Sequence, residues 1–228
     1  MDSFPEQREM SKDDYVIILG DFGIWRDSPQ QRWYLNWLEE KRFTTLFIDG
    51  NHENYDVLDS YPVEEWHGGK VHFIKPSVIH LMRGQVFDID GLKFFTFGGA
   101  ASHDISDGVL EIDDPRVKEW RDDPDKMYRI NHISWWEREM PNKEEMDEGI
   151  KNLAEHNNKV DFILTHCTAS STAALLSHGL YKPDKLTNYL EEVRCNIDYK
   201  HWLCGHYHDN KAITTKDIVL YEQIVRVA

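Results

Sequence analysis

Short apolar runs alternate with an amphipathic stretch in the first part of the chain. Tyr15–Leu19 and Phe43–Ile48 are apolar and rich in β-branched residues, a pattern typical of buried strands. Between them, Ser28-Pro29 predicts a helix start, because Ser caps helices and Pro suits the first helical position. Trp33 and Trp37, four residues apart, predict a stripe that faces the core. Strand, helix and strand with short connections predict a βαβ unit with parallel strands.

The pattern of apolar and polar residues changes after residue 70, where short apolar runs follow one another closely. Four strands are predicted over residues 71–74, 78–82, 85–89 and 92–97. Asp90-Gly91 is a hairpin signal between the last two, so we expect an antiparallel meander. Further strands are predicted over residues 160–164, 201–204, 212–215 and 218–227, and helices over 142–156, 171–177 and 185–193. The alternation of elements indicates an α/β fold.

Residues 102–141 interrupt this regular pattern. They are polar and charged, and Trp135-Trp136 lies near their end, where it is expected to anchor the segment by packing. We interpret them as an excursion from the sheet edge that is partly helical. A loop this long in a compact domain is usually functional. No linker, repeat or low-complexity segment occurs, so we expect residues 1–228 to form a single domain.

The acidic balance of the chain limits its partners. Its 228 residues include 41 Asp and Glu against 26 Lys and Arg, a formal net charge of −15. That charge disfavours long nucleic acid as a partner. The three cysteines form no C-x-x-C pair, no apolar run is long enough to span a bilayer, and the N-terminus lacks a signal-peptide pattern. We therefore expect a cytoplasmic protein with no membrane partner.

Side chains that bind metals or carry protons follow several predicted strands. Asp21 follows the first strand, Asn51-His52 the second, His166 the strand at 160–164, and His206 and His208 the strand at 201–204. In open α/β sheets, ligands bind beyond the carboxyl ends of the strands, so these side chains are expected at one edge. Carboxylate and amide oxygens mixed with imidazole suit divalent Mn, Fe, Zn or Co.

Four short blocks at these strand ends resemble a known family. Gly20-Asp21, Gly50–Glu53, Thr165-His166 and Gly205–His208 look like four of the five blocks of the calcineurin-like metallophosphoesterase superfamily, in the family order. The resemblance covers nearly the whole chain. It implies a four-layer α/β/β/α sandwich, with two mixed β-sheets flanked by helices. It also implies hydrolysis of a phosphomonoester or phosphodiester by a two-metal, bridging-hydroxide mechanism.

The resemblance assigns a role to each residue of the blocks. It makes Asp21 the carboxylate that bridges two divalent metal ions. Asn51, His166 and His206 would complete one metal site, and His208 would serve the other. His52 would donate a proton to the leaving group. The expected ions are Mn²⁺, Fe²⁺ or Fe³⁺, Zn²⁺ or Co²⁺.

The chain departs from the family pattern at its start. The family opens with a strand that ends in Asp-x-His, and no histidine precedes Asp21 here. One metal site is therefore complete, whereas the other keeps Asp21 and His208, fewer than the three protein ligands usual in catalytic sites. We expect a chain that starts late and lacks the N-terminal strand. We also expect impaired activity, which a restored Asp-x-His strand would rescue.

Residues outside the blocks are candidates for substrate contact. Many relatives carry Asp-Arg shortly after Gly-Asp, and here Ile24 takes the place of that Asp, which leaves Arg26 as the phosphate-directed candidate. His103 lies in Ser102-His103-Asp104, whose members are too close in sequence to form a catalytic triad. We interpret this segment as a loop that touches substrate. Glu53 is expected to cap the following helix or to orient His52.

Two other functions fit the same residues. The missing block favours a catalytically silent scaffold that binds a partner or a nucleotide. A nuclease that acts on nucleic-acid ends is disfavoured by the charge of −15 and is not excluded by it. As a phosphoesterase, the chain would take a small phosphoester, a nucleotide or a phosphoprotein as substrate.

Overall fold

The predicted βαβ unit opens the fold and forms one edge of a mixed sheet. The computed structural model describes residues 4–24, 26 and 28–227. A short 3-10 helix, η1 (Pro5–Arg8), precedes β1 (Tyr15–Leu19), α1 (Pro29–Glu39) and β2 (Thr44–Ile48), and β1 and β2 pair in parallel. The Ser28 side chain caps α1 by accepting a hydrogen bond from the Gln31 N–H at 3.1 Å, as the sequence predicts.

The described residues place five strands in the first sheet, in the order β1-β2-β5-β4-β3. The remaining elements of this sheet and its outer face are α2 (Tyr55–Leu58), β3 (Val63–Trp66), β4 (Gly69–Lys75) and β5 (Val78–Leu81). β5 runs parallel to β2, and β4 is antiparallel to both β5 and β3. β1 therefore lies at the edge, and each of its residues is only half-buried, although the sequence predicts a fully buried strand.

In the part of the chain that the structure describes, the second sheet holds six strands in the order β12-β13-β11-β10-β7-β6. They are β6 (Gln85–Ile89), β7 (Leu92–Phe97), β10 (Phe162–Thr165), β11 (His201–Cys204), β12 (Lys211–Ala212) and β13 (Asp217–Val219). β7, β10, β11 and β13 are parallel, and the two edge strands are antiparallel to their neighbours. Its helices are α4 (Lys143–Glu155), α5 (Ser170–Leu176) and α6 (Lys185–Asn196).

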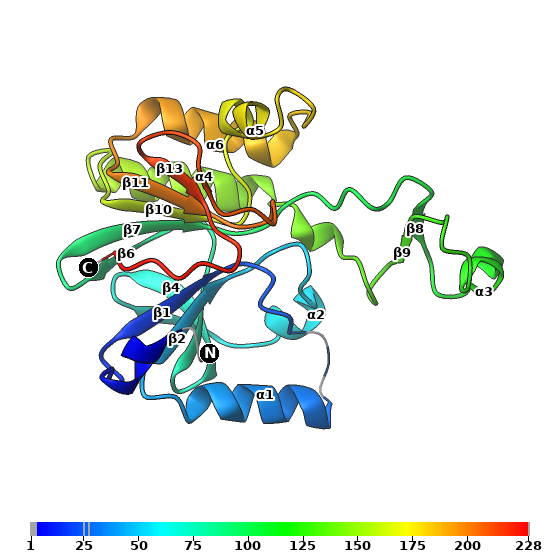
Figure 1. Ribbon diagram of the computed structural model, residues 1–228, viewed down its shortest axis with the longest axis horizontal. Coiled ribbons are helices and arrows are strands. Elements are labelled where there is room, and N and C mark those ends of the chain that lie inside the picture. Colours follow the sequence, from blue (N-terminus) through cyan, green and yellow to red (C-terminus); the bar gives the residue numbers. More distant parts are fainter. Residues whose placement is uncertain (1–3, 25, 27, 228) are drawn as a thin grey trace.

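The two sheets pack face to face between two layers of helices (Figure 1). Side chains alternate between the two faces of β2, so the strand contributes to a core on each side: Leu46 and Ile48 point into the core between the sheets, and Phe47 points to the helix side. Leu35 and Leu38 of α1 cover that outer face. The structure thus confirms the predicted α/β/β/α sandwich of two mixed sheets.

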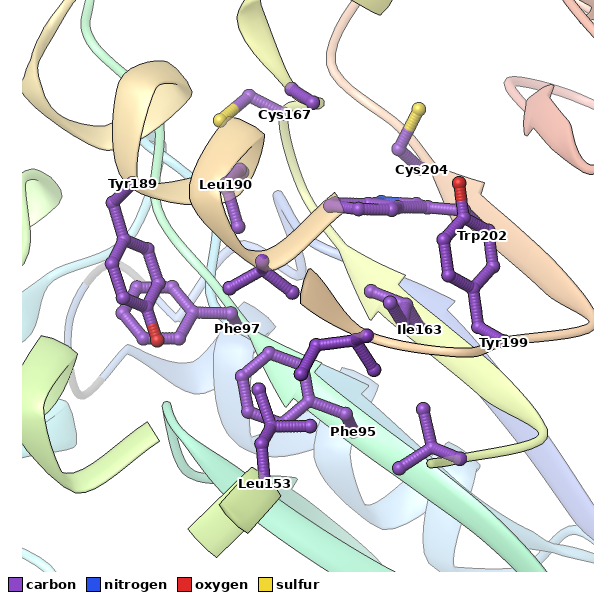
Figure 2. Packing of buried hydrophobic residues seen from close by; sticks show 14 of the residues in the cluster. Phe95, Phe97, Leu153, Ile163, Cys167, Tyr189, Leu190, Tyr199, Trp202 and Cys204 are labelled. Carbon is purple, nitrogen blue, oxygen red and sulfur yellow. The ribbon is translucent and has the colours of Figure 1, made fainter. Parts of the chain in front are cut away.

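Aromatic residues fill the core between the second sheet and its helices (Figure 2). Phe95 and Phe97 of β7 and Trp202 of β11 are fully buried there. The Trp202 indole N–H donates to Thr165 Oγ1 at 2.7 Å, so its polar atom is satisfied inside the core. Tyr189 of α6 packs on Phe97 with ring centroids 4.7 Å apart. This core fixes the ends of β7, β10 and β11 against one another.

The excursion at residues 102–141 projects from the sandwich (Figure 1). It contains β8 (Gly108–Leu110), α3 (Pro115–Trp120), β9 (Tyr128–Ile130) and the 3-10 helix η2 (Glu137–Glu139), and β8 pairs with β9 in parallel. Trp136 anchors its end, as predicted. It is buried among the core residues beneath α1 and donates its indole N–H to Asp56 at 2.7 Å.

Several local predictions differ from the structure. Trp33 is 65% exposed and stacks on Trp37, because Leu35 and Leu38 form the face of α1 that packs on the sheet. The predicted meander is split, since β5 and β6 belong to different sheets. The last predicted strand ends at Val219 instead of residue 227. No helix in the described part of the chain is long and apolar enough to cross a membrane.

Candidate metal centre

The parallel strands of both sheets deliver the predicted residues to one region. Asp21 lies two residues beyond β1 and Asn51 three residues beyond β2, in the first sheet. His166 directly follows β10 and His206 lies two residues beyond β11, in the second sheet. His166 joins the sheets, because its Nδ1 lies 2.7 Å from the Leu19 carbonyl oxygen of β1.

His166 has the tautomer that a metal ligand needs. A carbonyl oxygen only accepts hydrogen bonds, so Nδ1 carries the proton and the neutral ring has its lone pair on Nε2. That Nε2 lies 3.2 Å from Asp21 Oδ1 and 3.2 Å from Asn51 Oδ1. His166 and Asn51 are buried. With the ring neutral, lone pairs from three side chains converge, an arrangement that a cation would satisfy.

The glycines of the sequence blocks make this convergence possible. A Cβ on Gly20 would lie 2.0 Å from His166 Nδ1, and a Cβ on Gly50 would lie 2.1 Å from Asp21 Oδ1. On Gly205 it would lie 2.5 Å from the Leu19 carbonyl oxygen. Each glycine thus clears the space that a neighbouring candidate ligand or its support occupies.

Backbone strain also concentrates in this region. Asp21, His206 and His208 have φ angles of 51°, 67° and 49°, which side chains other than Gly rarely adopt. Residues held in this left-handed conformation cost stability and cluster at functional sites.

The groups around Asp21 keep it ionised. Burial raises the pKa of Asp21, but the imidazoles and the backbone N–H around it outweigh burial and hold that pKa well below its usual range. Asp21 Oδ1 also accepts a hydrogen bond from the His52 backbone N–H at 3.0 Å. Burial lowers the pKa of the His52 imidazole, while the charge of Asp21 raises it.

A comparison of the sequence with models of known protein families found a match. The sequence model of calcineurin-like phosphoesterases matches residues 2–210. The chain belongs to the calcineurin-like phosphoesterase family. Members of this family are, in general, metal-dependent phosphoesterases. A search of curated proteins found no significant match to the chain.

The donor atoms fit a divalent ion of the kind this family binds. Ligands at right angles on an ion with bonds of about 2.1 Å lie roughly 3 Å apart. The separations of 3.2 Å between His166 Nε2 and the oxygens of Asp21 and Asn51 match this spacing. Within the described residues, no three His, Cys, Asp or Glu side chains form a group able to hold a metal ion.

His206 and His208, which follow β11, differ in their position relative to the cluster. The His206 ring packs edge-on against His166 with centroids 5.0 Å apart, and burial lowers the pKa of His206 to about 3, which keeps the ring neutral and able to bind metal. His208 is exposed, and its ring stacks on Tyr221 at 4.8 Å. His206 therefore lies beside the cluster, and His208 turns toward the C-terminal segment.

The candidate substrate residues differ in their distance from the cluster. The exposed His103 ring lies 6.1 Å from the His206 ring. Arg26 is exposed on the connection from β1 to α1. A residue that the sequence did not single out, Arg129 of β9, donates from Nε to Asp104 at 3.0 Å, and its charge lowers the pKa of His52. The only sequence signal for Arg129 was its place in the long excursion.

Glu53 has a different role from the one predicted. Its buried carboxylate accepts hydrogen bonds from the backbone N–H groups of Phe22 at 2.7 Å and of Gly23 and Ile24 at 3.1 Å each. Asn54 caps α2 instead. Glu53 therefore fixes the segment that follows Asp21, and it ties the first and second blocks together.

Proposed function

We propose that this chain hydrolyses a phosphomonoester or phosphodiester at the cluster formed by Asp21, Asn51, His166 and His206. The observation that carries the proposal is the convergence of the His166 Nε2 lone pair with the oxygens of Asp21 and Asn51 at 3.2 Å. The Leu19 carbonyl holds the opposite nitrogen of the His166 ring as an N–H donor, which leaves Nε2 available to a cation.

Each residue of the cluster has a defined part in holding the ions. Asp21, Asn51, His166 and His206 would hold one divalent ion, and Asp21 with His208 would hold a second. Mn²⁺, Fe²⁺ or Fe³⁺, Zn²⁺ and Co²⁺ all accept this mixture of oxygen and imidazole ligands. When bound, such ions offset charge on the phosphoryl oxygens and activate water. With fewer protein ligands for the second ion, we propose that turnover is impaired.

His52 is our candidate for the proton donor. Its backbone N–H is fixed to Asp21 at 3.0 Å, so its imidazole is held next to the cluster. A positioned acid of this kind contributes about 10²–10⁴-fold to hydrolysis by protonating the leaving oxygen. Arg129 adds a guanidinium on the same side, and guanidinium groups pair well with phosphoryl oxygens. His103 and Arg26 are further candidates for contact with the substrate.

The substrate class follows from the charge of the protein. A net charge of −15 favours a small phosphoester, a nucleotide or a phosphoprotein over long nucleic acid. Salt-dependent binding of oligonucleotides, lost at moderate ionic strength, would instead favour a nuclease. We further propose that residues 1–228 act as a single domain. In support, both sheets contribute to one shared core.

A binding scaffold is the second candidate function. Its support is the position of His208, which stacks on Tyr221 at 4.8 Å. A scaffold would bind a phosphate-containing ligand without turning it over. Ligand binding by calorimetry, combined with no hydrolysis of the same ligand, would favour it.

A substrate panel with a matched histidine control tests the proposal. Phosphomonoesters, cyclic nucleotides and bis(p-nitrophenyl) phosphate are incubated with the protein and Mn²⁺, with and without a chelator. We expect slow Mn²⁺-dependent hydrolysis that His166→Ala abolishes. His156→Ala serves as the control, because His156 lies at the end of α4 and its ring Nδ1 lies 2.8 Å from the carbonyl oxygen of Asn152 in the same helix. Hydrolysis that survives His166→Ala would refute the assignment.

A further inference from the structure

The two ends of the Asn51 amide group are chemically different, and only one of them suits a cation. Its Oδ1 lies 3.2 Å from His166 Nε2, and its Nδ2 donates a hydrogen bond to Ser102 Oγ at 3.2 Å. A rotation of the amide by half a turn would direct two N–H donors toward the cluster and withdraw the oxygen. The group that fixes the amide therefore determines whether Asn51 is a ligand.

Ser102 accepts that hydrogen bond because its own proton is engaged elsewhere. Its Oγ–H donates to Glu139 Oε2 at 2.7 Å, and its backbone N–H donates to Glu139 Oε1 at 2.8 Å. With the hydroxyl proton directed at a carboxylate, the lone pairs of Ser102 Oγ face Asn51. The direction of every hydrogen bond in the series runs from Asn51 through Ser102 to Glu139.

Glu139 is placed to act as a fixed acceptor. Glu139 is only 2% exposed, although it lies in a segment of mostly polar sequence. Its carbonyl oxygen accepts from Arg83 Nη2 at 3.3 Å, and Arg83 itself is held by Asp49, directly before the Gly50-Asn51 turn. Ser102 opens the excursion and Glu139 lies near its end, so this contact closes the excursion next to the cluster.

We propose that Ser102 and Glu139 are positioning residues that hold the Asn51 amide oxygen toward the metal ion. The inference rests on the proposed metal site and assigns it a support from the 102–141 excursion. Removing such an outer partner typically weakens metal binding by about 10–100-fold. We expect a loss at the lower end of that range for Ser102→Ala, because Asp21 and His166 keep their positions.

Titration with Co²⁺ tests the proposal without measuring catalysis, since visible absorption reports both affinity and coordination. Ser102→Ala should weaken Co²⁺ binding about tenfold and change the spectrum, and Glu139→Gln should weaken it as well. Ser102→Thr keeps the hydroxyl and should restore binding. Ser134→Ala is the matched control, because it removes a hydroxyl of the same excursion that bonds to the Ile130 N–H at 2.9 Å. Circular dichroism verifies that each variant is folded.

A second background separates positioning of the amide from a general structural role. A carboxylate has two equivalent oxygens, so the Asn51→Asp background has no incorrect amide orientation to prevent. There, Ser102→Ala should reduce Co²⁺ affinity by less than about threefold, against about tenfold in the natural background. Equal losses in both backgrounds, or an equal loss in Ser134→Ala, would overturn the proposal. If the wild-type protein binds no Co²⁺, the proposed function itself fails.

Discussion

The buried ion pair of Asp49 and Arg83 supports the turn that carries Asn51 and His52. Asp49 Oδ2 accepts from Arg83 Nε at 2.8 Å and from Arg83 Nη2 at 2.6 Å. It also accepts from the Tyr55 hydroxyl at 2.9 Å. Burial raises the pKa of Asp49, but the charge of Arg83 outweighs it and keeps that pKa well below its usual range. We predict that Asp49→Asn strongly destabilises the protein.

The size of the effect follows from the burial of the pair. The side chains of Arg83 and Asp49 are 3% and 2% exposed. Among the described residues, Asp49→Asn therefore leaves the buried guanidinium with Glu145, at 3.4 Å, as its remaining ion-pair partner. Breaking one partner of a buried pair costs about 3–5 kcal/mol, because the other charge stays desolvated and uncompensated. That is a large fraction of a typical folding stability of about 5–15 kcal/mol.

Urea unfolding of a double-mutant cycle measures this prediction. The variants are Asp49→Asn, Arg83→Met and the double variant. Each single change should lower the free energy of unfolding by about 3–5 kcal/mol, whereas the double change should cost clearly less than the sum. Glu155→Gln is the matched control, because Glu155 pairs with Lys151 at 3.7 Å on the exposed surface and should cost less than about 0.5 kcal/mol.

Two results would refute the reasoning about this ion pair. The first is a loss below about 1 kcal/mol for Asp49→Asn, which would place the pair in the range of an exposed salt bridge. The second is simple additivity in the cycle, which would show that Asp49 and Arg83 stabilise the fold independently.

Three further predictions concern the site and its surroundings. Gly20→Ala should abolish metal binding, since the added Cβ would meet His166 at 2.0 Å. Gly179→Ala is the control: Gly179 has a similar positive φ and no atom within 4 Å of the added Cβ, so this change should cost only about 1 kcal/mol of stability and leave metal binding intact. Equal Mn²⁺ binding by the two variants, measured by calorimetry, would contradict this prediction. Burial, with His80 nearby, lowers the pKa of His72 to about 4, below the ordinary value of 6.5. The unfolded chain then binds more protons, so stability is full above pH 6.5 and is lost as the pH falls toward 4, by roughly 2 kcal/mol between pH 7 and 5. Urea unfolding should show this dependence in the wild type and in His156→Gln, and His72→Gln should reduce it by roughly 2 kcal/mol, the remainder coming from groups such as His206, whose pKa is also lowered. An unchanged slope in His72→Gln would exclude His72 as a source. Arg129→Ala should raise the KM for a phosphoester about tenfold with a smaller change in kcat, and an unchanged KM would remove Arg129 from substrate binding.

Local patterns predicted the fold and pointed to the candidate residues of the site. Asn142 and Glu145 are three residues apart, and they form the capping box that starts α4. The sequence blocks likewise place a glycine directly before a candidate ligand at the end of a strand, so Asp21 and Asn51 are visible in the sequence. In both cases the physical cause lies within a few residues of the effect, and for the blocks the family resemblance supplies the roles.

Long-range contacts explain what the sequence could not show. Asp49 and Arg83 are 34 residues apart, and Ser102 and Glu139 are 37 apart, so neither pair leaves a local signature. The error in the predicted end of the last strand has a different cause, because there the local pattern predicted more strand than the fold contains. Residues 218–227 contain enough apolar residues for a strand, but the ladder with β11 ends at Val219, opposite Cys204, the last residue of β11. An apolar pattern indicates which residues favour burial, whereas the neighbouring strand decides where pairing ends.

The metal content of the purified protein tests the central claim most directly. After incubation with Mn²⁺ and removal of the excess, metal analysis should find about one ion per chain, as expected for a single complete set of protein ligands. His166→Ala should reduce that content to background, and His156→Ala should leave it unchanged. No ion in the wild-type protein, or the same content in His166→Ala, would contradict a metal centre at this cluster.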